Sequence, residues 1–573
     1  MTTQGEGGTI TITGTLSTSQ EAEFRTSGLS SNITLRGNLD VGGDLTVKTS
    51  GEGSSLNITD GSIVLSDESS ATFSSSGSDS PLHVSGTVAG SSVLFKSSGD
   101  SSNIVVDGTL SASAPLTFRA HGADSDIAVN GAISGENDVK LSLHESGSIY
   151  VRNSVEAGGT LKAKTRGGNI EVPCDLVAER GICLFSGQKV KVSAGGSISV
   201  AATVKTSVDG VHLSADGALQ VAGNVKAADS VEFSAGSDVS VTGDVSADTG
   251  TIDVSSGASV TVSGDVSAAG SVDVDAVEST DVTGTVNAGA DVSVSSGADT
   301  VISGDISADT GPIEVSAGSD LQVSGSVSAG EDVSLSASSA GSELQVSGSV
   351  SAGEDVSLSA SSTIVVSGDV SADTGPIEVS AGSDLQVSGS VKAGEDVSLS
   401  ATSTIVVSGD ISADTGPIEA TSGSSFQISG SVSAAGDVAV SSGGALYIEG
   451  SVSSAGGDIE CISEDTITVV DSDVSGSSGV TIDADSTVSV SGTVTSGEGD
   501  IELSAGDGTS LWIAAETKFQ WPGYVGEVYE DSFAEETNIL FAAGDDTIWG
   551  KEKKRKKYKQ RSNIVVINVY ESV

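Results

Sequence analysis

Apolar and polar residues alternate along most of the chain, and the alternation restarts at regular intervals. In the stretch LQVSGSVSAGEDVSLSA, every second position from Leu321 to Ala329 is Leu, Val, Gly or Ala, and the alternation resumes after the corner GED. A period of two is typical of a β-strand with one buried face and not of a helix. We therefore expect short strands that all turn their apolar side chains toward one core.

This pattern returns every 20 or 21 residues over most of the chain. The segment VSGSVSAGEDVSLSA at 323–337 recurs unchanged at 346–360, and with one substitution, Lys392, at 387–401. Such a period indicates a solenoid, in which each unit completes the core of its neighbours. The glycine of a V-x-G-x-V motif marks the repeat at Gly223, Gly243, Gly264, Gly284, Gly304, Gly325, Gly348, Gly368, Gly389, Gly409, Gly430 and Gly450, and looser copies have Asn153, Cys174, Ala202 or Ser472 in this slot.

The corners carry Gly, Asp, Ser and Pro, which form turns, and Gly325 marks a bend between two short strands. We predict an all-β fold, a right-handed parallel β-helix (β-solenoid) of about 23 coils of 20–25 residues with three strands per coil. Its core is expected to be a column of Val, Leu and Ala too narrow for aromatic rings. Leucine-rich and helical repeats are excluded, because half of each unit would need helical periodicity.

The composition divides the chain into four predicted segments: an N-terminal cap strand (1–13), the β-solenoid (14–508), an aromatic-rich C-terminal cap or docking module (509–550), and a basic run with a terminal strand (551–573). The strand is predicted from NIVVINVY. Residues 140–200 depart most from the repeat, and we interpret them either as a lateral binding patch or as a tolerated insertion.

The C-terminal segments hold the candidate interaction residues. Aromatic side chains plug the open end of a solenoid or form the buried part of an interface. A basic run binds acidic surfaces, such as the body of another copy, or is a solvated tail. The candidates are Trp512, Trp521, Tyr524, Tyr529 and Trp549, with Lys553, Lys554, Arg555, Lys556 and Lys557.

The net charge is −53, and Lys392 is the one basic residue between 227 and 517. Such a body repels nucleic acid and anionic membranes, and the acidity serves solubility or cation binding. The 3 Cys and 4 His form no disulfide framework or ligand set in the sequence. The chain shows no secretory signal and no apolar run long enough for a spanning helix, so we expect no transmembrane segment.

We expect no catalytic, cofactor-binding or metal-binding residues. Pectate-lyase-like and polygalacturonase-like solenoids cleave sugars on one face, but Asp305, Asp369 and Asp410 recur in one slot without Arg or aromatic partners. Nothing distinguishes one carboxylate as acid and another as base. Stacked acidic corners such as Glu331 and Asp332 are the candidates for Ca²⁺ binding.

In its VSGSVSAGEDVSLSA coils, with G-x-V/I and AGxDVxLxA phrases, the chain resembles filamentous-haemagglutinin-type adhesin repeats over roughly residues 10–500. It is similar, more distantly, to bactofilin-like solenoids that polymerise inside cells. It departs from the adhesins in showing no recognisable leader, secretion domain or C-terminal barrel, so we expect export by a route without a visible signal peptide.

The resemblance implies a non-enzymatic structural rod at the cell surface or outside the cell, adhesive or fibre-forming. Its partners are expected to be other copies of itself or a cell-surface or glycan ligand. An intracellular self-assembling filament in the cytoplasm and a carbohydrate-active β-helix enzyme are the alternatives.

Overall fold

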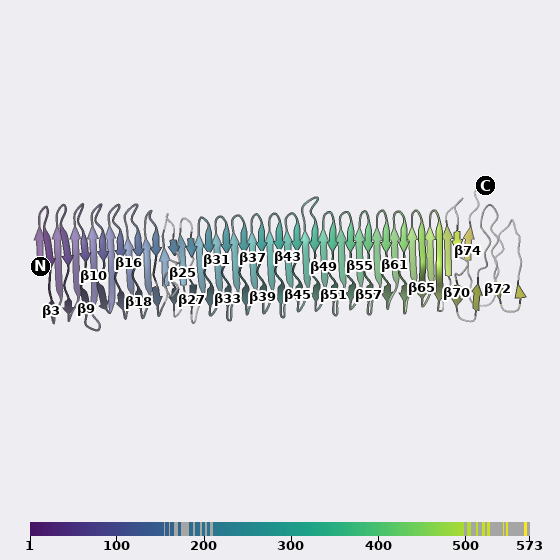
Figure 1. Cartoon of the computed structure of the whole chain (residues 1–573), viewed down its shortest axis with the longest axis horizontal. Coiled ribbons are helices and arrows are strands. Elements are labelled where there is room, and N and C mark those ends of the chain that lie inside the picture. The colour runs from purple at the N-terminus through teal and green to yellow at the C-terminus, as the bar shows by residue number, and fades with distance from the viewer. Residues whose placement is uncertain are drawn as a thin grey trace. The chain divides into compact units, whose positions relative to one another are not determined.

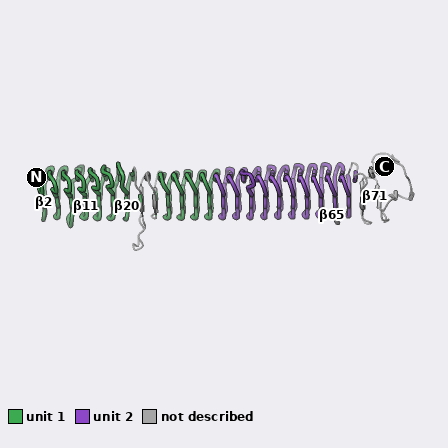
Figure 2. Tube along the Cα trace, turned by 90° about the horizontal axis from the view of Figure 1, so that it is seen from above, with its two compact units in different colours: residues 1–296 green, residues 297–573 purple. Residues whose placement is uncertain are grey.

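A computed structural model of the chain contains two compact units, residues 1–296 and 297–573 (Figure 2). The residues that the structure describes are 1–153, 155–159, 161–165, 170–172, 183–186, 190–194, 198–200, 203–206, 210–497, 501–505, 511–513, 518–521, 524–527, 542–543, 546–547 and 566–569.

Each regular coil consists of three short strands. In the second unit, one coil contains β44 (Leu321–Val323), β45 (Val327–Ala329) and β46 (Val333–Ala337), and the next contains β47 (Leu344–Val346), β48 (Val350–Ala352) and β49 (Val356–Ala360). Each strand pairs in parallel with its counterpart one coil later, so that Leu321 lies opposite Leu344 and Val333 opposite Val356 (Figure 1). Because a parallel ladder needs its partner in register, every coil meets the same environment.

The first unit follows the same rule. Its β31 (Val231–Ala235) pairs in parallel with β34 (Ile252–Ser256), and β32 (Val239–Val241) pairs with β35 (Val260–Val262). The described residues contain strands and no helix, and they form about 22 turns. The predicted all-β parallel β-helix is confirmed, with a coil number close to the predicted one, whereas its right-handed winding stays a prediction.

In each regular coil the third strand is the longest, and in each unit these strands form one sheet, here called the long-strand face. In the first unit this face contains β4 (Ala22–Ser27), β7 (Leu45–Ser50), β10 (Ser70–Ser76), β13 (Ser92–Ser98), β16 (Leu116–Ala120) and β19 (Val139–Leu143). In the second it contains β52 (Ile377–Ala381), β55 (Val397–Ala401), β58 (Ile418–Ser422), β61 (Val438–Ser442), β64 (Ile459–Ser463), β66 (Val480–Ala484) and β68 (Ile501–Ala505).

The core is the column of inward-facing side chains. Leu321, Val323 and Val327 are each at most 1% exposed, and the polar residues between them, Gln322, Ser324 and Ser326, face solvent, as the alternation predicts. Burial of one such Val or Leu contributes roughly 1.5–3 kcal/mol. Because successive coils within a unit contribute to one column, the stability of a coil depends on its neighbours above and below.

Aromatic rings do enter this core, so the prediction that it is too narrow for them is wrong. Phe73, Phe95 and Phe118 occupy one inward column, with ring centroids 5.0 Å and 5.1 Å apart and interplanar angles of 12° and 10°. Phe233 and Phe426 are also at most 1% exposed. Coils stack at about 4.8 Å, which suits rings that lie flat on one another.

The slot glycines form a second column along the bend between the two shorter strands. A Cβ atom on Gly389 would lie 2.1 Å from the carbonyl oxygen of Gly368 one coil earlier. The backbones therefore touch directly at this bend, and only glycine leaves room for the contact. The predicted bend at Gly325, between β44 and β45, is confirmed.

Ser472 shows what replaces the glycine when a side chain occupies the slot. Here β65 (Ile467–Gly476) runs through the bend as one strand, and its register against β67 (Val488–Ser496) shifts between Val469 and Ser472. One extra residue lies on the β65 side, as in a β-bulge. The bulge accommodates a side chain that a regular coil excludes.

The corners of the first coils contain a buried ladder of serines. The amide of Ser54 donates to Oγ of Ser80 at 3.2 Å, and the Ser80 amide donates to Oγ of Ser102 at 3.0 Å. The Ser80 hydroxyl in turn donates to the carbonyl of Gly51 at 2.9 Å. These serines are fully buried, and the ladder satisfies polar groups that would otherwise be costly to bury.

One coil of the second unit has a corner of this longer kind. It lies within the 23-residue step from Gly325 to Gly348, and it contains Gly341 with a φ of 86°. Ser342 is 3% exposed, and its amide donates to Oγ of Ser361 at 3.1 Å. This corner lies between the two identical 15-residue segments and distinguishes their surroundings.

We expect Gly389→Ala to lower the free energy of unfolding by about 1–3 kcal/mol, because the added methyl group overlaps the Gly368 carbonyl. Urea unfolding followed by circular dichroism measures the effect. Ser388→Ala, an exposed neighbour, serves as the control and should change the midpoint little. An unchanged Gly389→Ala midpoint would contradict the close contact.

Cys461 is fully buried, and burial, with a smaller contribution from Glu460, raises the pKa of its thiol to about 12. In a Cys174→Ser, Cys183→Ser background, we expect it to resist an aromatic disulfide reagent at pH 8 until urea unfolds the chain, because only the thiolate reacts. The same variant in denaturant gives the full-reaction control. Rapid labelling of the folded protein would show that this core position opens.

Candidate interaction surfaces

The C-terminal candidates are only partly within the described residues. Trp512 lies in β69 (Leu511–Ile513), opposite Ser489 of β67. Trp521 and Tyr524 face each other across an antiparallel pair of β70 (Lys518–Trp521) and β71 (Tyr524–Glu527). The following candidates lie outside the described residues: Tyr529, Trp549, Lys553, Lys554, Arg555, Lys556 and Lys557.

The antiparallel pairing of β70 with β71 differs from the parallel pairing of the coils. The strand predicted from NIVVINVY is present as β74 (Val566–Val569) and pairs in parallel with β68. At the other end, β1 (Thr2–Gln4) pairs in parallel with β4. The segment boundaries and the interaction roles of the C-terminal residues stay predictions.

The recurring aspartates, which lie beside the slot glycines or at the corners, accept hydrogen bonds from the backbone of the next coil. Oδ1 of Asp305 accepts the amide of Ser326 at 2.8 Å, and Oδ1 of Asp410 accepts that of Ser431, also at 2.8 Å. Asp332, named above as a candidate for Ca²⁺, accepts the amide of Asp355 at 3.0 Å. Sequence reasoning missed this role, although the repeated Gly-Asp pair one coil before a Ser was its signal.

In the first unit one such aspartate accepts two hydrogen bonds. Oδ1 of Asp265 accepts the amide of Thr285 at 3.0 Å and its hydroxyl at 2.8 Å, and both bonds lower the pKa of the Asp265 carboxyl. The amide of Asp265 itself donates to Asp244 at 3.2 Å. A column of acceptors thus runs from coil to coil at the slot glycine.

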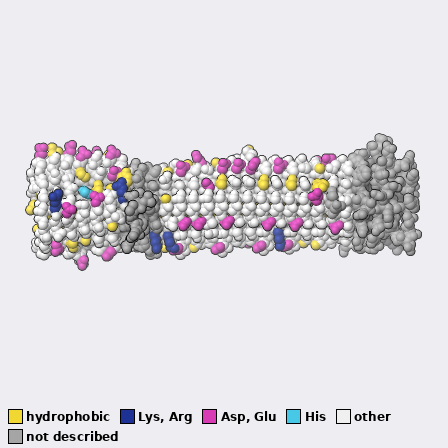
Figure 3. Space-filling model, in the orientation of Figure 1, with side chains coloured by type: hydrophobic (Ala, Val, Ile, Leu, Met, Phe, Trp, Pro, Cys, Tyr) yellow, Lys and Arg dark blue, Asp and Glu magenta, His cyan; other side chains and the backbone are white. Residues whose placement is uncertain are grey.

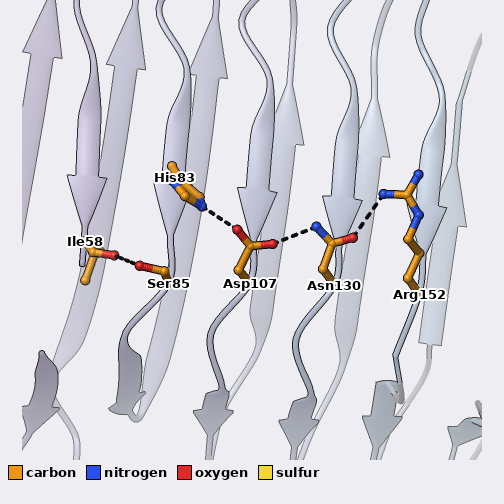
Figure 4. A network of polar contacts seen from close by, with 6 residues as sticks. All are labelled: Ile58, His83, Ser85, Asp107, Asn130 and Arg152. Atoms are coloured by element: carbon orange, nitrogen blue, oxygen red, sulfur yellow. Dashed lines mark hydrogen bonds and ion pairs between the residues drawn. The ribbon is translucent and has the colours of Figure 1, made fainter. Parts of the chain in front are cut away.

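A row of polar side chains crosses four coils in the sheet that the shorter strands of each coil form (Figure 4). The His83 ring lies 2.6 Å from Asp107, the Asn130 amide donates to Asp107 at 2.7 Å, and Arg152 donates to Asn130 at 3.2 Å. The Asn130 and His83 bonds lower the pKa of Asp107. Arg152 also lies 5.3 Å from the centre of the Tyr150 ring. Its members satisfy one another, so the row stabilises the stack of coils.

Two of the four histidines contact each other, although the sequence analysis predicted no such pair. The rings of His121 and His144 stack with centroids 4.0 Å apart and planes 4° apart. Burial lowers the pKa of His121, and His144, Lys96 and Arg119 lower it further. They lie 23 residues apart, close to one repeat, which was the signal for their contact.

Two carboxylates, those of Asp253 and Asp273, lie opposite each other on neighbouring strands of the long-strand face, away from the corners. Asp253 on β34 lies opposite Asp273 on β37 (Val272–Ala276), and burial and then the charge of Asp253 raise the pKa of Asp273. In the described part of the chain, no three His, Cys, Asp or Glu side chains gather as metal ligands. Nor is any helix there long and apolar enough to cross a membrane.

Figure 3 shows acidic side chains in rows that follow the direction in which the coils stack, with few basic ones among them. The rows arise because each coil places equivalent residues at equivalent positions. On the face shown in Figure 3, the charges therefore lie in columns.

We expect the melting temperature of the Asp265→Ala variant to lie below that of the natural chain at neutral pH. Because the folded-state pKa is below the ordinary value of 3.8, the stabilisation is present above about pH 4 and is lost as the pH falls through the folded-state pKa. The difference in melting temperature should therefore vanish in acid. Asp216→Ala, which removes another exposed carboxylate, is the control. A difference that persists in acid would contradict this role of the carboxylate.

Comparisons with known proteins agree with this architecture. The family model of the haemagglutinin repeat matches residues 86–165, 301–375, 369–423, 408–460 and 464–510, which together cover just over half of the chain. No curated protein and no solved structure matches. The predicted resemblance to filamentous-haemagglutinin-type repeats is confirmed, and the chain belongs to the haemagglutinin-repeat family.

Proposed function

We propose that this protein is a non-enzymatic structural protein at the cell surface or outside the cell, adhesive or fibre-forming. Haemagglutinin repeats and a parallel β-solenoid fit a structural, adhesin-like protein. The observation that supports this best concerns the carboxylates beside the slot glycines. Asp305, Asp369 and Asp410 each accept a hydrogen bond from a backbone amide of the next coil. The recurring acids thereby serve the scaffold.

The carbohydrate-active alternative would use Asp253 and Asp273. A carboxyl with a raised pKa beside a second carboxylate is the pair that glycosidases use. Their neighbours in register are Ser293 and Glu232, so neither an aromatic platform nor an Arg adjoins them on this column. A polysaccharide panel that shows cleavage abolished by Asp273→Asn would establish this alternative and contradict the structural role.

An intracellular self-assembling filament remains the other alternative, and it differs from the proposal in location. The repeat family is consistent with both adhesive binding and self-association. Location in the source cell is therefore the property that separates the two functions.

We expect antibodies against the second unit to label intact, unpermeabilised cells, and added protease to remove the label. An antibody to a known cytoplasmic protein of the same cells controls for lysis. Label that appears only after permeabilisation would place the protein inside the cell and contradict the proposal. Filaments in sections of the same cells would then support the intracellular alternative.

A further inference from the structure

The long-strand face of the first unit carries basic residues on an otherwise acidic chain. Lys48, Ser74, Lys96 and Arg119 lie in one outward column, opposite one another across β7, β10, β13 and β16. The three basic side chains are exposed. We call this surface, defined by the outward residues of these four strands, the basic face.

No acidic residue projects from the basic face. Its other outward positions are Thr46, Ser50, Ser70, Thr72, Ser76, Ser92, Leu94, Ser98 and Thr117. Acidic residues such as Asp44 and Asp100 lie at the corners beside it. In a chain with 78 Asp and Glu against 25 Lys and Arg, the basic face has thirteen outward positions and no carboxylate among them.

The basic side chains have no neutralising partner within the described part of the chain. None of the ion pairs there includes Lys48, Lys96 or Arg119. Lys140, one strand further along on β19, is paired with Asp138 at 3.0 Å. The first three charges are therefore free for an anionic partner.

The long-strand face of the second unit has the opposite character. Glu378, Glu419, Glu460 and Glu502 lie in one outward column on β52, β58, β64 and β68, and all four are exposed. Each is separated from the next by one intervening strand. We call these four residues the glutamate column.

The glutamate column also lacks partners among the described residues. None of its members belongs to an ion pair there. Lys392, the basic residue of this part of the sequence, lies in the other sheet on β54 (Val391–Ala393) and is 3.5 Å from Asp414. Both charged surfaces are thus uncompensated within the parts of the chain that the structure describes.

The two surfaces share one spacing. Lys48 and Lys96 are two coils apart, as are successive members of the glutamate column, and two coils span about 9.6 Å in any parallel stack. Both columns project from strands of the long-strand face. Lys48 and Lys96 can therefore pair with two successive glutamates at once when the two faces lie side by side with their coils aligned, and Arg119 adds a positive charge one coil beyond Lys96.

We propose that the basic face of one molecule binds the glutamate column of a second copy, so that the molecules associate laterally. This inference rests on the proposed structural function and names its partner as the chain itself. Exposed ion pairs contribute little singly and are screened by salt. The association therefore depends on several pairs in register and weakens as the salt concentration rises.

Sedimentation velocity of the full chain at about 50 mM and about 500 mM NaCl tests this proposal. We expect association at low salt that is lost at high salt. Lys48→Glu, Lys96→Glu, Arg119→Glu combined should weaken it about tenfold or more, as should Glu378→Lys, Glu419→Lys, Glu460→Lys combined. Mixing the two triple variants should restore association, because each then offers the charge that the other requires.

A matched control is Arg36→Glu, Lys226→Glu, Lys392→Glu combined, which changes the net charge equally away from the basic face and should associate as the natural chain does. Circular dichroism of every variant confirms its fold. A monomer at low salt, or failure of the mixed variants to associate, would overturn the proposal. So would a monomer that binds dextran sulfate through the basic face, since the partner would then be a polyanion. None of these results bears on the location of the protein in the cell.

Discussion

The parallel hydrogen-bond ladder between successive coils is the constraint on which the rest of this structure depends. It fixes the distance from one coil to the next at about 4.8 Å and places equivalent residues directly above one another. Each inward Val therefore packs on the Val of the next coil, and each outward charge lies beside its equivalent. The core, the glycine bend, the serine and aspartate ladders and the charged columns all follow from this one alignment.

The ladder also explains why polar residues at the corners serve structure more than chemistry. A corner leaves backbone amides without a partner from the sheet, and a carboxylate or hydroxyl one coil away supplies it. Asp265 and Ser80 illustrate the two versions, one exposed and one buried. Binding properties that differ from one part of the molecule to another must then come from outward columns whose charged side chains do not bond to the backbone of a neighbouring coil.

The alternation and the 20-residue period were sufficient to predict the strands, the inward face and the parallel stacking, because both follow from local pattern. The exclusion of rings was wrong for Phe95, since the argument considered the width of the core and not the stacking of rings along it. The role of Asp410 and the contact of His121 with His144 depend on which residues lie one coil apart. That information is present in the sequence, but it emerges only when the coils are aligned in register. The C-terminal aromatic residues do not repeat, so periodicity says nothing about their contacts.

The two identical segments at 323–337 and 346–360 pose a problem during folding. A chain that skipped one coil could pair either segment with the same neighbour and form the same contacts there, so the repeat itself does not distinguish the correct pairing from the shifted one. The corner that contains Gly341 and Ser342 breaks this degeneracy, because a skipped coil would deprive Ser342 of the Ser361 hydroxyl. One irregular turn thus specifies the pairing register in a part of the chain whose repeats would otherwise be interchangeable.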